Sequence, residues 1–316
     1  SGGAIVDANA TGNDLIAANL ALIAVTGIGS ANPLETGVSV LAASNTTGGN
    51  VQVTNSVGGL LTIGTVGAVV GVTNAGTGGG NIVVINSSPL TVASDVVASA
   101  GGSITLTASV PGNLTINARL VAGGGNGNIT LNAGTDLIIN DSGSAVDVSA
   151  AGTGAITAVA EQKITLNANV VVQAVAGKVA FTADNLAGNN GHTLFMNDTA
   201  LIDAGSGTVT LTADGSITLG GLKTTNATAA AVTVTTPSGA VVDGGDTYLE
   251  VEANSGTVTI ADQTVAYSGK TASSLTGCSG GTGSFGQANE VVQRSTFSRM
   301  EIHADRIVAV RADGKA

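Results

Sequence analysis

The sequence predicts an all-β fold, a parallel β-helix (β-solenoid) with about 26 residues and three short strands in each coil. The first of three observations behind this prediction is composition. Glycine accounts for 47 of 316 residues, aromatic residues for 2% and charged residues for 10%. Because 43% of the chain is hydrophobic, it does not have the composition of a disordered protein. The core must therefore be a regular array of small aliphatic side chains.

The second observation is a recurring phrase, in which a small residue precedes alternating apolar and polar residues. Residues 102–108 read Gly-Ser-Ile-Thr-Leu-Thr-Ala, and residues 127–133 read Gly-Asn-Ile-Thr-Leu-Asn-Ala. The first apolar residues of the successive phrases are Ile104, Ile129, Ile156, Val179, Val209, Val232 and Val258. Their mean spacing is about 26 residues, which is typical of solenoid repeats.

The third observation is that each period contains further short alternating segments, such as residues 113–118 and 120–122. Three strands per period describe one triangular coil, whereas a hairpin-built sandwich would lack the longer recurrence. Each inward position should then form an axial row, Ile104 and its equivalents in the first. The second row should contain Leu106, Leu131, Leu211, Val234 and Ile260. So narrow a bore favours aliphatic side chains over rings, and corner Gly and Asn should supply positive φ angles.

In chain order, the rod should occupy residues 1–267. Residues 1–48 repeat less regularly, and residues 14–25 fit either an Ala/Leu-rich capping helix or solenoid strands, of which we favour strands. A Gly/Ser-rich link over residues 268–286 leads to two strands within residues 287–316. These strands either close the rod or pair with the open edge of a neighbouring molecule.

Charge is unevenly distributed along the chain. Residues 1–269 contain 17 acidic and four basic residues, whereas residues 270–316 contain four acidic and six basic residues. The acidic body makes nucleic acid an unsuitable partner. This charge asymmetry predicts that the basic end of one molecule contacts the acidic body of the next, which gives head-to-tail self-association. The predicted assembly interface contains Arg294, Phe297, Arg299, Met300, Ile302 and Arg306.

Sequence features bearing on location are few. Cys278 is the single cysteine, so no internal disulfide forms. The first residues lack the basic region of a signal peptide, as expected of a mature or excised segment. The most apolar stretch, residues 15–25, is shorter than the ~20 residues that a membrane-spanning helix needs. We therefore expect no membrane span.

The phrases at residues 102–108, 112–118 and 127–137 resemble the repeats of filamentous-haemagglutinin-like bacterial exoproteins, and so do residues 26–36 and 88–92. The resemblance covers roughly residues 13–262. It implies a right-handed parallel β-helix and an extracellular or cell-surface location, as a stalk, adhesin or matrix fibre. It is specific for architecture and weak for function, because one scaffold serves many roles.

No catalytic site can be identified from the sequence. His192 and His303 have no cysteine or carboxylate at metal-ligand spacing. The densest carboxylate group contains Asp243 and Asp246, followed by Glu250 and Glu252. Without nearby basic or aromatic residues to hold a sugar, this group does not predict a glycosidase. It fits a solvated turn, with weak calcium binding through Asp243 and Asp246 as the alternative and no other cofactor expected.

Outward positions repeat a Thr-x-Thr or Thr-x-Asn pattern, as in Thr105/Thr107 and Thr210/Thr212. Flat threonine ladders can bind ice, although threonine also simply suits exposed strands. The sequence thus leaves three functional hypotheses. The principal one is an extracellular structural rod that assembles head-to-tail into a fibre or surface layer. The alternatives are an adhesin that binds a glycan or host protein, and an ice-binding protein.

Overall fold

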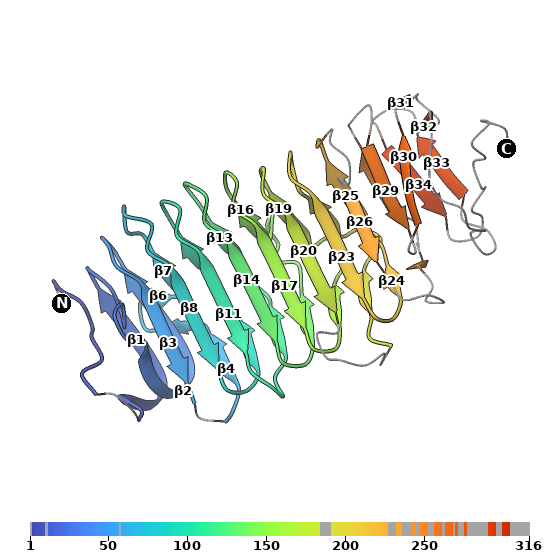
Figure 1. Cartoon of the computed structure of the whole chain (residues 1–316). Helices are drawn as coiled ribbons and strands as arrows, with labels where there is room; N and C mark the ends of the chain where they lie inside the picture. The colour runs from blue at the N-terminus through green and yellow to red at the C-terminus, as the bar shows by residue number, and fades with distance from the viewer. Residues whose placement is uncertain are drawn as a thin grey trace.

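The computed structural model describes residues 2–9, 12–56, 58–183, 191–226 and 232–235 with their side chains, and beyond these the backbones of strands between residues 242 and 303. Every regular element within them is a β-strand. Parallel strands stack as a β-solenoid of about nine turns with roughly 24 residues per turn (Figure 1). The predicted all-β solenoid is therefore confirmed. Across the first face defined below, in-register partners lie 22 to 31 residues apart, so coils vary in length around the predicted period.

The solenoid has three faces, each a column of parallel strands. The first face contains β3 (Val51–Asn55), β8 (Ile82–Asn86), β11 (Ile104–Ala108), β14 (Ile129–Ala133), β17 (Ile156–Ala160), β20 (Val179–Ala183), β23 (Val209–Ala213), β26 (Val232–Thr235) and β29 (Gly256–Ile260). The second face contains β4 (Leu61–Ile63), β9 (Leu90–Val92), β12 (Leu114–Ile116), β15 (Leu137–Ile139), β18 (Ile164–Leu166), β21 (Leu194–Met196), β24 (Ile217–Thr218) and β27 (Val242–Asp243). The third face contains β7 (Val72–Asn74), β10 (Val96–Ala98), β13 (Leu120–Ala122), β16 (Val148–Ala150), β19 (Val171–Ala174), β22 (Leu201–Asp203), β25 (Gly221–Thr224) and β28 (Thr247–Val251).

The N-terminal coils are built from longer strands. Of the two alternatives for residues 14–25, the structure has a strand, β1 (Leu15–Ala24), which pairs in parallel with β2 (Leu34–Asn45). The 12-residue β2 runs across all three faces, because its successive parts pair with β3, β4 and β7. A short antiparallel hairpin, β5 (Thr65–Val66) and β6 (Val69–Val70), follows β4.

The core consists of axial rows of like residues. Ile104, Ile129 and their predicted equivalents are in register along the first face, and those up to Val232 are buried. The second row differs from its prediction, because Ala158 and Phe181 lie in it between Leu131 and Leu211. Phe181 is fully buried. The bore holds this ring because the axial neighbour Ala158 is small.

Recurring glycines before the first-face strands allow successive corners to touch. A Cβ on Gly127 would overlap the carbonyl oxygen of Gly102, and one on Gly177 would overlap that of Gly154. The predicted reason for corner glycines, positive φ, holds for Gly101 (φ 86). It does not hold for Gly127 and Gly177, whose φ angles are not positive. Close axial approach of backbone to backbone explains these two.

Two buried asparagine ladders run through the N-terminal coils. Asn55 Nδ2 donates to Asn86 Oδ1 at 2.9 Å where the first-face strands end, and Asn45 Nδ2 donates to Asn74 Oδ1 at 2.9 Å where the third-face strands end. All four side chains are fully buried. Nothing in the local sequence predicted that these asparagines are buried. Their burial shows that the core is not purely aliphatic.

The parallel coils end at β28 and β29, before residue 267, the predicted end of the rod. β30 (Gln263–Tyr267) pairs antiparallel with β29. β34 (Arg299–His303) pairs antiparallel with β28 and with β33 (Glu290–Arg294). Within the predicted link, β31 (Gly269–Lys270) and β32 (Leu275–Thr276) pair with each other. Antiparallel strands thus lie on the last strands of the first and third faces.

Candidate functional site

Those predicted site residues that the structure describes lie in the last strands of the chain. Arg299, Met300 and Ile302 lie in β34, and Arg294 is in register with Arg299. Phe297 and Arg306 lie outside the described residues. Asp243 ends β27 with only its backbone described, and Asp246 also lies outside the described part of the chain. The calcium hypothesis for Asp243 and Asp246 stays a prediction.

A carboxylate cluster that the sequence did not predict lies instead in the N-terminal coil. One oxygen each of Asp7, Asp14 and Glu35 lies within 4.8 Å of the others. Glu35 N donates to Asp14 Oδ2 at 3.2 Å, and Asn9 Nδ2 donates to Asp14 Oδ1 at 2.6 Å. Asn32 Nδ2 donates to Asp7 Oδ2. Glu35 Oε2 is buried and has no hydrogen-bond partner among the described residues.

This cluster offers the hard oxygen ligands that calcium prefers. Its two aspartates also accept hydrogen bonds from Asn32 and from the backbone N–H of Glu35, which ties Asp7 and Asp14 to the chain at the start of β2. No local motif could predict it, because Asp14 and Glu35 are 21 residues apart and meet only through the parallel pairing of β1 with β2. It is a candidate cation site and a closure of the first coil.

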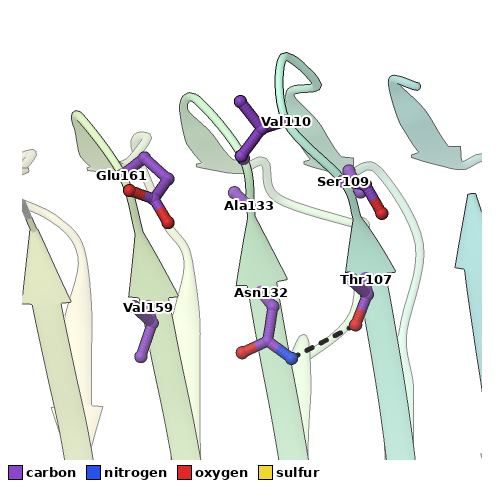
Figure 2. Close-up of a pocket in the computed structure, with 9 residues that line it drawn as sticks. Thr107, Ser109, Val110, Asn132, Ala133, Val159 and Glu161 are labelled. Atoms are coloured by element: carbon purple, nitrogen blue, oxygen red, sulfur yellow. Dashed lines mark hydrogen bonds between the residues drawn. The ribbon is translucent and has the colours of Figure 1, made fainter. Parts of the chain in front are cut away.

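A hollow of about 350 Å³ opens where β11, β14 and β17 end. Figure 2 shows Ser109 and Glu161 on either side of Ala133, which also lines the hollow. Asn132 Nδ2 donates to Thr107 Oγ1 at 3.2 Å. Glu161 Oε2 is buried without a hydrogen-bond partner within the described chain. A ligand in the hollow would reach this oxygen only after the Glu161 side chain turned toward it.

The lining of the hollow limits its chemistry. Glu161 is the one titratable residue among those that line it. A glycoside-cleaving site needs two carboxylates, one as acid and one as base or nucleophile. The hollow can therefore hold a hydroxyl or amino group but does not itself provide an acid–base pair.

An ion pair joins two coils at the third face. Arg119 Nη2 lies 2.5 Å from Asp95 Oδ2, and Arg119 N donates to Asp95 Oδ1 at 3.0 Å. The hydrogen bond and the charge of Asp95 raise the pKa of Arg119 above its ordinary value. The side chains are 45% and 36% exposed, so solvent screens the attraction. This pair links coils rather than forming a binding site.

The predicted threonine pattern becomes an ordered surface on the first face. Thr105 is in register with Thr130, and Thr130 with Thr157. Thr210 and Thr212 are likewise in register with Thr233 and Thr235. The pattern that is local in sequence is therefore aligned along the axis.

No family model, curated protein or solved structure shows a significant similarity to this chain.

Proposed function

We propose that this chain is an extracellular structural protein whose β-solenoid forms a stiff rod and assembles head-to-tail into a fibre or surface layer. One observation carries the proposal: three columns of strands continue in register from coil to coil around one continuous, mainly aliphatic core. With strands about 4.8 Å apart, nine turns extend over roughly 43 Å. Axial backbone hydrogen bonds and a continuous core resist bending, so the proposed role is mechanical rather than catalytic.

The charge distribution supports growth in one direction. The body through residue 269 has four bases against 17 acids, whereas the remainder has an excess of bases. β33 runs antiparallel to β34, which runs antiparallel to β28, so β33 has the direction of the solenoid strands. A strand with this direction can extend the column of a second molecule in parallel. The resemblance to haemagglutinin-like exoproteins supports the extracellular location.

Electron microscopy of the purified chain tests the assembly. We expect filaments at low salt that shorten as salt increases, because screening weakens contacts between exposed charges. Arg294→Glu with Arg299→Glu should abolish them, whereas Arg119→Gln in the body should not. Isolated rods at high concentration and low salt would contradict the proposal.

The hollow beside Glu161 favours a second candidate function, adhesion to a glycan. Glu161 lines the hollow, and its oxygen Oε2, which lacks a partner among the described residues, would accept a sugar hydroxyl once the side chain turned toward the ligand. Glycan-array binding should be lost in Glu161→Gln and retained in Asp141→Asn, which changes an exposed carboxylate outside the hollow. Equal binding by the two variants would rule out this site.

A further inference from the structure

The outward side of the first face is a two-row array with uniform chemistry. From β3 to β26 its 16 positions contain neither a charged nor an aromatic residue. From β11 to β26, nine of the 12 positions are threonine. One row contains Thr105, Thr130, Thr157, Ala180, Thr210 and Thr233, and the other contains Thr107, Asn132, Val159, Thr182, Thr212 and Thr235.

The array is closely packed. The outward side chains of β11, β14, β17, β20 and β23 are all half-buried, because each is shielded by its neighbours in the coils above and below. Strand spacing places members of a row about 4.8 Å apart, and alternation places the two rows about 6.7 Å apart. Threonine has few side-chain rotamers, so the hydroxyl and methyl groups lie on a nearly fixed grid.

The chemistry of this surface narrows what can bind it. Ionic recognition needs charged side chains and sugar stacking needs aromatic rings, and the 16 positions themselves offer neither. Thr107, Asn132 and Val159 also line the hollow, whose carboxylate comes from Glu161 beyond the rows. The hydroxyls can each hold a water molecule, while the methyl groups lie between them without competing for hydrogen bonds. A regular grid of this kind holds water at repeating positions, and its axial repeat is close to the oxygen repeat in hexagonal ice.

Where their side chains are described, from β4 to β24 and from β7 to β25, the other two faces lack this arrangement. The second face has one outward position in each three-residue strand, and Phe195 interrupts that row with 39% exposure. The third face carries Asp203 and Lys223 at outward, in-register positions. Water near charged side chains is oriented by those charges rather than by a lattice.

We propose that the first face, from β11 to β26, binds ice by ordering water on its threonine rows. The ligand is a crystal plane of water, and Ala180, Asn132 and Val159 are the weak points of the grid. The proposal does not depend on head-to-tail assembly, because a single rod presents the whole array.

Thermal hysteresis of the full chain tests the proposal, and inhibition of ice recrystallisation is a second readout. Wild-type protein should show both activities. Thr157→Lys places a long cation in the middle of one row and should abolish them. Thr165→Lys is the matched control, because Thr165 is the outward, half-buried residue of β18 in the same coil. The control should retain wild-type activity. Circular dichroism should show that both variants are folded.

A gain of function keeps the test decisive if Thr157→Lys does not fold. Ala180→Thr completes the row between Thr157 and Thr210 and should increase the hysteresis. Wild-type protein without hysteresis, or equal loss in Thr157→Lys and Thr165→Lys, would overturn the proposal. The proposal would also be overturned if the first face joined two rods side by side. Sedimentation would then show a wild-type dimer that Thr157→Lys dissociates, and the wild-type protein would show no hysteresis. Filament images are scored separately, so a failure of assembly is distinguishable from a failure of ice binding.

Discussion

The N-terminal coils and the central coils fill the same strand-end position differently. On the first face, Asn55 and Asn86 are followed in register by Ala108, Ala133, Ala160, Ala183 and Ala213. On the third face, Asn45 and Asn74 are followed by Ala98, Ala122, Ala150 and Ala174. Buried amides therefore occupy these positions in the first coils, and small methyl groups occupy them afterwards.

This difference shows two ways of fixing strand register. Asn55 accepts from Val38 N at 2.8 Å and Thr36 Oγ1 at 3.0 Å, and it donates to Val38 O and Asn86 Oδ1. All of its hydrogen-bonding groups are used. A shift of the strand by one residue would turn the amide outward, and a shift by two would bury it without these partners, so both registers are disfavoured. Where β2 crosses all three faces and alternation is weak, the amides specify register. In the central coils, regular alternation suffices.

The largest effect should come from Asn55→Asp. The carboxylate would face Val38 O and Asn86 Oδ1, both acceptors, in a fully buried position. An uncompensated buried charge costs about 3–5 kcal/mol of unfolding free energy. Urea denaturation followed by circular dichroism measures this. Asn117→Asp is the control, because Asn117 is exposed and accepts from Asn140 Nδ2 at 2.6 Å. Equal destabilisation by the two changes would contradict a role for burial.

Ala160→Asn should have a smaller effect. It places an amide between Ala133 and Ala183, at a fully buried position that does not line the hollow, so the packed row has no room for it. Overpacking of this kind costs about 1–3 kcal/mol. An unchanged denaturation midpoint would show that the central coils tolerate a buried asparagine at this position. Packing would then not explain why the two regions differ there.

A double-mutant cycle on Asn55→Ala and Asn86→Ala should give a coupling free energy of about 1 kcal/mol. Each single change leaves the other amide without its 2.9 Å partner, whereas the double change removes both. The backbone carbonyls of Gly59 and Pro89, which accept from Asn86 Nδ2, lose a donor in both Asn86 variants. Strictly additive losses would mean that the two side chains act independently.

The smallest effect should follow Arg119→Gln, which removes the ion pair between two central coils. An exposed pair of this type contributes less than about 1 kcal/mol. Thermal melting at low and high salt should show a small difference that salt removes. A large loss of stability would mean that the central coils depend on polar contacts as the N-terminal coils do.

Local sequence determined the fold class, the short strands, the inward first row and the threonine pattern. These features depend on alternation and recurrence, which neighbouring residues display directly. The candidate sites could mostly not be predicted from local sequence. Glu161 lines its hollow with Ser109, 52 residues earlier, only because successive coils stack. The same holds for Asp14 and Glu35.

Three features depend on tertiary structure alone: the burial of particular asparagines, the lack of space for a side chain at Gly127 and Gly177, and the position of Phe181 in the core. A pattern within one coil states which way a side chain points, but not what lies one coil above or below it. That neighbour is set by the register between coils of unequal length, from 22 to 31 residues. Buried contacts along the axis therefore appear only once the chain has wound.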